Sequence, residues 1–268
     1  MKHDTSLVLR VCNADFTSYN GFQWPSEIGA DTTAPDWKAN NKCGNGLHGW
    51  LHGYGDVGAT DYWSNRDAKW LVLEVPSSEI IDLGGKVKFP SATVRFIGSK
   101  SDAAEFILKN DQQAVADTII GLSLSVGDNR SVSVGDLGTA IAGDLGTAIA
   151  GKYGTASAGD LGSATAGDGG SAIAGNHGSA SAGEYGTATA GYNGSATAGE
   201  HGTAIAGKHG SATAGRYGSA SAGEYGVLMI KYWDSCRDRY AVAYVGENGI
   251  LPNVKYKLDD NHNFVVAE

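Results

Sequence analysis

Cysteine, proline and basic residues are all scarce in this sequence. The three cysteines, Cys12, Cys43 and Cys236, form no CxxC pair, which indicates a reducing compartment and excludes a disulfide framework. Five prolines beside 40 glycines exclude a Pro/Gly linker composition. The 20 basic residues are outnumbered by 29 acidic ones, for a formal charge of −9. This balance argues against a protein that binds nucleic acid by neutralising phosphates.

Long apolar runs are also absent. No stretch approaches the 18 apolar residues of a transmembrane helix, so we expect no membrane partner. The start, "MKHDTSLVLRVCNADF", lacks the apolar run and small-residue cleavage site of a signal peptide. We therefore expect no signal peptide.

Three segments differ in composition, and we predict three domains: 1–120, 121–226 and 227–268. The first segment has the pattern of a small α+β domain, and we predict strands at 7–12, 70–75, 87–89 and 93–98. "SKSDAAEFILKN" predicts a helix with Ser101 as N-cap and Ala104, Phe106, Ile107 and Leu108 on its apolar face. "DQQAVADTII" either continues this helix or forms a second one. The last segment predicts an antiparallel meander of four strands, in "VLMIKYW", "RYAVAYV", "VKYKL" and "FVVAE".

The middle segment repeats an octad, G-x-x-G-[ST]-A-[TSI]-A. Eleven complete copies run from Gly135 to Ala222 without insertion or deletion, which is typical of a solenoid. Alanines two residues apart fit the period of a strand, and the glycines mark turns that need residues able to adopt positive φ. A disordered linker would not keep this alternation. The fold class is therefore mainly β: an alanine-cored β-solenoid (parallel β-helix) between two smaller domains.

We expect two octads to close one coil, because alanine is too small to fill the triangular interior of a three-octad coil. Alanines face inward, and the Ser, Thr and Ile positions face outward. Val132 and Val134 replace the inward alanines at one end of the array, and Leu228 and Ile230 replace them at the other. Larger apolar residues suit the capped ends that a solenoid needs.

The outward row of threonine and serine resembles that of ice-binding and ice-nucleating solenoids, whose repeats also carry AGxxGSxxT-like phrases. Two features favour the simpler interpretation that small and β-branched residues suit strands. Serine and threonine mix freely in the first row, and isoleucine interrupts the second row at Ile141, Ile149, Ile173 and Ile205.

The variable x-x pairs carry most of the charges and rings of the array. Acids dominate the early pairs, and aromatic residues the later ones. If the array binds a partner, the candidate residues are Asp136, Asp144, Asp160, Asp168, Tyr185, Glu200, Tyr217 and Glu224. An acidic rod could mimic the phosphates of a duplex, but the simpler interpretation is a solvated edge that prevents aggregation. His177, His201 and His209 are irregularly spaced, so we predict no metal ladder.

"CGNGLHGWLHGYGD" (43–56) is the densest candidate site in the first segment. His48 and His52 have the i, i+4 spacing of a helical zinc site, and Cys43 and Asp56 flank them. Gly49 and Gly53 disfavour the helix, and the glutamate of HExxH is missing. We therefore predict no metal site, and interpret the motif as a loop whose glycines let the backbone approach a neighbour.

A second constellation consists of Arg10, His48, Tyr62 and Glu74. A basic residue on the first strand, a glycine-rich turn and a strand glutamate resemble the layout of ADP-ribosyltransferases. The resemblance implies that the basic residue and a His or Tyr hold NAD, while the glutamate stabilises the ribosyl cation. The "HGT"-type phrase of that family is absent here, and Glu74 lies in an apolar strand.

A longer resemblance covers nearly the whole chain. "SYNGFQWP", "CGNGLHG", "WLVLEV" and "VKFP", then a Gly/Ala-rich array and the tail "ILPNVKYKLDDNHNFV", resemble a family of uncharacterised phage and prophage proteins. The resemblance implies a phage-encoded protein in the cytoplasm of a bacterial host, without an established activity.

These observations favour a non-enzymatic binding protein without a cofactor. Its acidic solenoid would engage a host protein, such as a nucleic-acid-binding or defence protein, as a counter-defence inhibitor or DNA mimic. We expect no direct contact with nucleic acid, and a homodimer is one expected assembly. An ADP-ribosyltransferase-like enzyme and a virion fibre or spike component are the alternatives.

Overall fold

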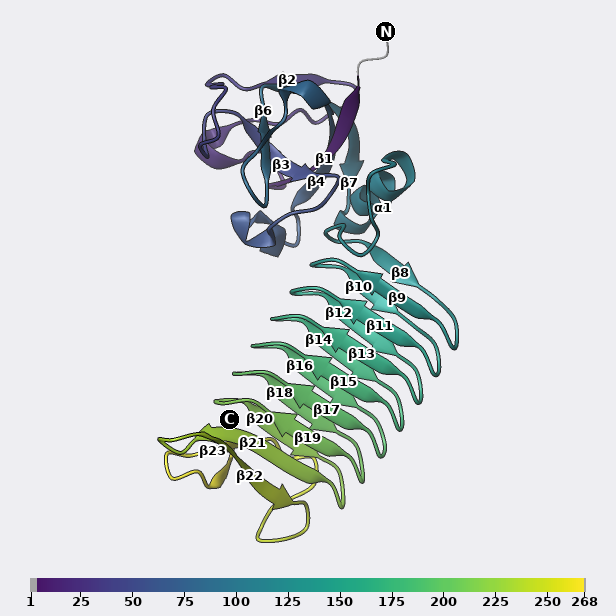
Figure 1. Cartoon of the computed structure of the whole chain (residues 1–268), viewed down its shortest axis with the longest axis vertical. Helices are drawn as coiled ribbons and strands as arrows, with labels where there is room; N and C mark the ends of the chain where they lie inside the picture. The colour runs from purple at the N-terminus through teal and green to yellow at the C-terminus, as the bar shows by residue number, and fades with distance from the viewer. Residues whose placement is uncertain (1–3, 268) are drawn as a thin grey trace. The chain divides into compact units, whose positions relative to one another are not determined.

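The computed structural model describes residues 4–267, which fall into two compact units divided between Ser123 and Leu124. The fold is mainly β, as the sequence predicts (Figure 1). The three-domain division of the chain stays a prediction. No helix among residues 4–267 is long and apolar enough to cross a membrane.

The first unit is built on a seven-stranded antiparallel sheet. Its core is formed by large apolar side chains, among them Leu9, Leu71 and Phe89, all fully buried. The strands, in spatial order, are β2 (Asp31–Thr33), β7 (Ser91–Gly98), β4 (Lys69–Pro76), β1 (Thr5–Cys12), β3 (Leu47–Leu51), β6 (Val87–Phe89) and β5 (Ile81–Asp82). Four 3₁₀ turns connect them: η1 (Tyr19–Gly21), η2 (Val57–Ala59), η3 (Tyr62–Ser64) and η4 (Ser77–Glu79).

The predicted helix is α1 (Lys100–Asn110), but its N-cap is Ser99 rather than Ser101. The Ser99 hydroxyl accepts a hydrogen bond from the Asp102 amide (3.3 Å) and donates one to the Asp102 carboxylate (2.6 Å). This reciprocal cap places Ser101 inside the first turn. Residues 111–120 form turns, so the prediction that they are helical is wrong. Asp111 leaves the helical conformation (φ −115°, ψ 112°) and thereby ends the helix.

The second unit is the predicted solenoid, with two octads in each coil (Figure 1). Every strand of the array pairs in parallel with the strand sixteen residues away, as Ala156 does with Ala172. The eight-stranded sheet begins at β9 (Ser131–Val134) and continues through β11 (Thr147–Ala150), β13 (Ser163–Ala166), β15 (Ser179–Ala182), β17 (Ser195–Ala198) and β19 (Ser211–Ala214). The nine-stranded sheet begins at β8 (Ser123–Ser125) and continues through β10 (Thr139–Ile141), β12 (Thr155–Ala158), β14 (Ser171–Ala174), β16 (Thr187–Ala190), β18 (Thr203–Ala206) and β20 (Ser219–Ala222).

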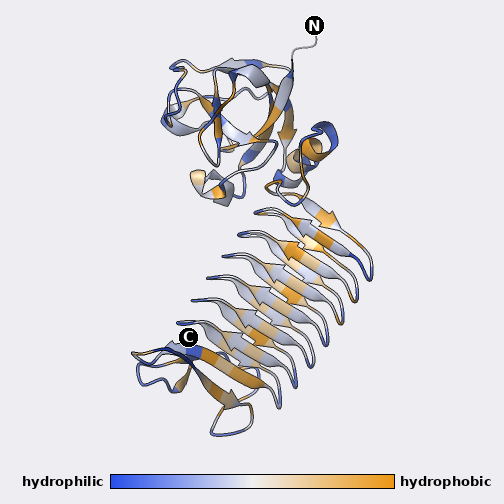
Figure 2. Ribbon diagram, in the orientation of Figure 1, coloured by the Kyte–Doolittle hydropathy of each residue, from blue (hydrophilic) through white to orange (hydrophobic). Residues whose placement is uncertain are grey.

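Alanines fill the interior of the solenoid, as the alternation predicts. The inward alanines of the repeat are at most 6% exposed, whereas the residues between them face outward. Figure 2 shows the hydrophilic residues concentrated in the turns at the edges of the coils. Val132 and Val134 close one end of this core and Leu228 and Ile230 the other, each aligned with an alanine of the neighbouring coil.

The four C-terminal strands form as predicted, but as two hairpins. β21 (Val227–Trp233) joins the eight-stranded sheet parallel to β19 and pairs antiparallel with β22 (Asp238–Tyr244). β23 (Tyr256–Leu258) joins the nine-stranded sheet antiparallel to β20 and pairs with β24 (Phe264–Val266). Each hairpin therefore extends one of the two solenoid sheets and covers its last strand.

Candidate functional site

The octad pattern predicted a positive φ at the repeat glycines. Each solenoid turn instead places its positive φ on the second variable residue. Leu137, Tyr185 and His201 have φ values of 58°, 55° and 55°. A bulky residue in this conformation is strained by roughly 1–2 kcal/mol. The strain is offset because its amide reaches the next coil: Leu137 N–H donates to the Lys152 carbonyl at 2.8 Å.

The repeat glycines are required for a different reason, which is close approach between coils. A Cβ on Gly199 would lie 2.7–2.9 Å from backbone atoms of Gly183 and Glu184 in the preceding coil. Gly127 occupies the same octad position at the start of the array, and a Cβ there would meet nothing within 4 Å. The glycine is thus dictated by the neighbouring coil and not by its own φ.

The four candidate aspartates bind the backbone of the solenoid. The Asp136 and Asp160 carboxylates accept hydrogen bonds from the amides of Lys152 (2.8 Å) and Asn176 (2.7 Å) in the following coils. Asp144 and Asp168 accept equivalent bonds. Asp136 and Asp168 lie in the turns on one edge of the coils, and Asp144 and Asp160 in the turns on the other. They therefore form no single acidic row, and their binding role stays a prediction.

The remaining candidates also contact neighbouring coils. The rings of Tyr185, His201 and Tyr217 stack in a column with centroid separations of 4.8 and 5.1 Å. Glu224 pairs with Lys208 (2.8 Å). These contacts join residues sixteen positions apart, from one coil to the next, as the hydrogen bonds of the aspartates do earlier in the array.

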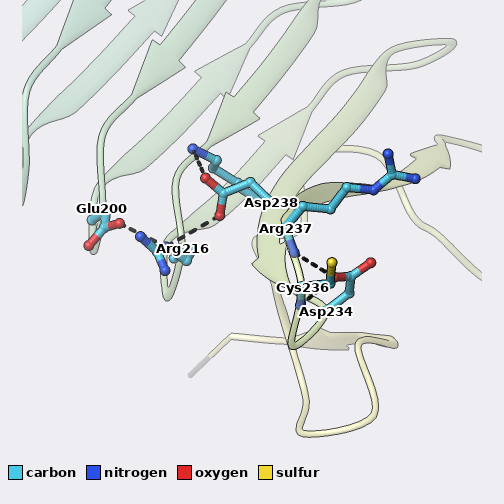
Figure 3. A network of polar contacts seen from close by, with 7 residues as sticks. Glu200, Arg216, Asp234, Cys236, Arg237 and Asp238 are labelled. Atoms are coloured by element: carbon cyan, nitrogen blue, oxygen red, sulfur yellow. Dashed lines mark hydrogen bonds and ion pairs between the residues drawn. The ribbon is translucent and has the colours of Figure 1, made fainter.

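Glu200 belongs to a polar network that joins the last coils to the C-terminal strands (Figure 3). Arg216 Nε lies 2.9 Å from Glu200 and 3.8 Å from Asp238, which also pairs with Lys231 at 2.7 Å. In the adjacent turn, the Asp234 carboxylate pairs with Arg239 and accepts hydrogen bonds from the Arg237 and Cys236 amides, which together lower the pKa of Asp234 to about 2.

Two faces of the solenoid carry outward hydroxyls, and they differ in regularity. On β13, β15, β17 and β19, both outward positions of every strand hold serine or threonine. We name this set the hydroxyl face: Ser163, Thr165, Ser179, Ser181, Ser195, Thr197, Ser211 and Thr213. The structure gives these hydroxyls no partner within residues 4–267, so they are free to bind water. On the nine-stranded sheet, Ile141, Ile173 and Ile205 alternate with polar residues and are 38–44% exposed.

In the first unit, the structure brings Arg10 and His48 together but separates them from Glu74. Arg10 Nη1 donates to the His48 carbonyl at 3.2 Å. Tyr62 lies close enough to act electrostatically on Arg10. Glu74 pairs with Leu7 in the β1–β4 ladder, while Arg10 pairs with Leu71, so the two side chains project from opposite faces of the sheet.

Glu74 has its own partners on that opposite face. Its carboxylate accepts a hydrogen bond from the Thr5 hydroxyl (2.8 Å) and pairs with Arg95. It lines a smaller cavity of about 410 Å³ together with Arg95 and Asp111. A glutamate fixed in this way cannot reach a ligand held at Arg10.

The residues of "CGNGLHGWLHGYGD" do not converge either. His48 lies in strand β3, while His52 adopts a positive φ (54°) in the turn after it and bonds to Asp111 at 2.7 Å. Within residues 4–267, no three His, Cys, Asp or Glu side chains gather as a metal site would require. Gly49 allows close strand packing, because a Cβ there would lie 2.4 Å from Val8 and 2.6 Å from the Leu9 carbonyl.

Comparisons with known proteins point to two separate relationships. Residues 6–109 match a family described as a domain of unknown function (DUF7666). The chain is also 38% identical over 106 residues to an ice nucleation protein of Xanthomonas campestris pv. translucens, which is 39% of this chain and 6% of that protein. It is 34% identical over 120 residues to ice nucleation protein InaU of Pantoea ananas (44% and 11%), and 38% identical over 112 residues to an ice nucleation protein of Pseudomonas fluorescens (41% and 9%). No solved structure matches.

These relationships correct the functional hypothesis drawn from the sequence. An uncharacterised N-terminal domain followed by a repeat array is supported. The hypothesis of a phage protein that binds a host macromolecule is wrong, because the relatives are bacterial ice nucleation proteins. The ADP-ribosyltransferase and virion alternatives fail with it, and so does the location in a host cytoplasm. These relationships do not test which partner the chain binds, so the expected host-protein partner and homodimer stay predictions.

Proposed function

We propose that the solenoid is an ice-contacting surface and that its hydroxyl face is the part that orders water. The observation that carries the proposal is the run of four consecutive parallel strands with a hydroxyl at both outward positions, from Ser163 to Thr213. The matched ice nucleation proteins support this use of the array. The chain spans about a tenth or less of the length of those relatives, so their activity as whole proteins carries over only as part of this proposal.

The geometry of the parallel sheet makes the hydroxyl face a two-dimensional array. Ser179 aligns with Ser195, and Ser181 with Thr197, without a shift in register. Hydroxyls therefore repeat at about 4.8 Å from strand to strand and about 6.6 Å along each strand. Two rows at constant spacings offer hydrogen bonds to a water layer that is itself periodic.

Rigidity is the second requirement, and the interior of the solenoid supplies it. Alanine has no side-chain torsion between heavy atoms, so the sheet does not change shape by repacking its core. The aspartate and backbone ladders at the edges fix the spacing of successive coils. The hydroxyls are thus held in position before water or ice is present, which lowers the entropic cost of contact.

The test compares the two sheets of the same solenoid. Thr197→Lys places a long charged side chain at the centre of the hydroxyl face, and Thr189→Lys places the same side chain on β16 of the nine-stranded sheet. Thermal hysteresis and the freezing temperature of supercooled droplets are measured for the full chain and both variants. We expect activity in the parent protein, its loss in Thr197→Lys and its retention in Thr189→Lys.

Circular dichroism shows whether each variant keeps its strand content. A parent protein without hysteresis or an effect on freezing would show that the array does not contact ice. Equal loss in two folded variants would show that the hydroxyl face is not the contact surface.

A further inference from the structure

A cavity of about 900 Å³ opens in the N-terminal unit, within the size range of small-molecule sites. Its walls come from β1, β3, the segment 18–24 and the loop 43–46. Aromatic side chains dominate its apolar lining: Tyr19, Phe22, Trp24 and Trp50. Tyr19 is 69% exposed at the surface, while Trp24 is buried. The cavity therefore combines an aromatic wall with an open mouth.

Arg10 brings an unpaired positive charge to this cavity. Its guanidinium lies 5.0 Å from the centre of the Trp24 ring, and its Nε is buried without a hydrogen-bond partner. No carboxylate within residues 4–267 forms an ion pair with it. Burial lowers the pKa of Arg10 to about 10, so it is still charged at neutral pH. Leaving such a charge uncompensated is costly, and an anion from solution would relieve that cost.

His48 adds a second unsatisfied group to the lining of this cavity. Its Nε2 is buried without a partner, and the side chain lines the same cavity. Burial, and then the positive charges of Lys86, Arg10 and Lys88, lower the pKa of His48 to about 4. The ring is thus neutral at pH 7, and its free nitrogen can make one hydrogen bond to a ligand without adding charge.

The charged side chains of the lining favour an anion. Arg10 and Lys86 are the cations, and Asp36 is the acid. Asp36 already accepts a hydrogen bond from the Asn45 amide group at 3.2 Å.

The wall formed by 43–46 is held in place from behind. The fully buried Lys88 donates hydrogen bonds to Asn40 Oδ1 (2.9 Å) and to the Lys42 carbonyl (3.0 Å). Gly46, at φ 150°, packs so closely that a Cβ would lie 2.9 Å from the Trp37 ring. Fixing a loop through a buried lysine organises the cavity before a ligand arrives.

We propose that this cavity binds a small planar molecule that carries one anionic group. The ring lies against the aromatic wall, and the anionic group meets the guanidinium of Arg10, with His48 donating to or accepting from the ligand. The site is separate from the ice-contacting surface, and its test does not depend on that function.

Four probes separate the parts of this recognition: benzoate, phenyl phosphate, benzamide and inorganic phosphate. Each is titrated into the full ¹⁵N-labelled chain while the indole N–H signals of Trp24 and Trp50 are followed. We expect benzoate or phenyl phosphate to shift both signals saturably. Benzamide, which lacks the charge, and phosphate, which lacks the ring, should bind at least about tenfold more weakly. Comparing benzoate with phenyl phosphate identifies the anionic group.

Variants then assign the binding to the cavity. Arg10→Gln should weaken the better anionic probe by about tenfold or more. Lys86→Gln at the cavity serves if the first variant does not fold, and should weaken binding severalfold. Arg66→Gln removes the same charge from an exposed residue outside the lining and should leave binding unchanged. Absence of any indole shift, equal affinity for benzamide and benzoate, or equal losses in Lys86→Gln and Arg66→Gln would overturn the proposal.

Discussion

The two units of this protein hold their strands together in opposite ways. The N-terminal unit buries large side chains such as Leu9, Leu71 and Phe89, so its stability rests on apolar surface removed from water. The solenoid buries alanines and relies on close coil contacts and repeated backbone hydrogen bonds. The first unit should therefore be sensitive to side chains that are removed, and the second to side chains that are added.

The largest expected effect is in the N-terminal unit. Leu9→Ala should lower its free energy of unfolding by about 2–5 kcal/mol, because a fully buried side chain leaves a cavity. Five of the six tryptophans lie in this unit, so urea unfolding followed by tryptophan fluorescence reports on it. Val115→Ala, at a position that is 56% exposed, is the control. Similar losses in both variants would contradict a core-based stability.

Adding one methyl group should suffice to destabilise the solenoid. Gly199→Ala should cost about 1–3 kcal/mol, because the new Cβ overlaps backbone atoms of the preceding coil that cannot move independently. Gly127→Ala makes the same change at the same octad position, where the space is open, and should be almost neutral. Urea unfolding followed by far-ultraviolet circular dichroism distinguishes them. Equal stability of the two variants would show that coil packing is looser than the structure indicates.

Acid should affect the N-terminal unit through His48. Its pKa of about 4 in the folded chain lies below the roughly 6.5 of an unfolded histidine, so the unfolded state binds a proton first. The contribution of His48 is constant above about pH 7.5, and stability falls as the pH is lowered from about 6.5 towards 4. Because solvent screens the partly exposed ring, we expect this pKa difference to lower the free energy of unfolding by only about 1–2 kcal/mol.

The measurement is tryptophan-detected urea unfolding between pH 7.5 and pH 4. His48→Gln, which does not titrate, should lose less stability over this interval than the parent protein. An identical pH dependence in both proteins would exclude His48 as the source.

The smallest effect concerns a single residue of the aspartate ladder. Asp160→Ala removes the acceptor of the Asn176 backbone amide (2.7 Å) and of its side-chain amide (3.3 Å), and should cost the solenoid about 1 kcal/mol. Asp160→Asn keeps an oxygen at the same position and should recover most of that loss. The comparison uses dichroism-detected unfolding. A neutral Asp160→Ala would indicate that water replaces the carboxylate without cost.

The sequence alone predicted the solenoid in detail because the features that define a coil recur within each octad. An eight-residue period and alternating alanines are sufficient to assign the two-octad coil, the inward rows and the larger residues at its ends. The positive φ was placed on the wrong residues, because leucine or tyrosine adopts it only when the next coil accepts its amide. The aspartates were interpreted as surface charge for the same reason: the backbone amides that donate hydrogen bonds to their carboxylates lie sixteen residues further along the chain.

The site in the N-terminal unit shows the limit of sequence analysis more clearly. Arg10 and His48 were singled out together, but grouping them with Glu74 ignored the alternation of side chains along β1 and β4. Pairing of Leu7 with Glu74 depends on register, which short apolar runs do not specify. The cavity itself depends on segments 18–24 and 43–46, which lack regular secondary structure over most of their length.

The central claim is that the solenoid contacts ice, and partition into a slowly growing ice crystal tests it most directly. The full chain is frozen from dilute solution together with a soluble protein of similar size that does not bind ice, and both are measured in the ice and in the remaining liquid. We predict that this protein is enriched in the ice while the reference protein is excluded, and that Thr197→Lys is excluded as well. Exclusion of the parent chain to the same extent as the reference protein would contradict the account.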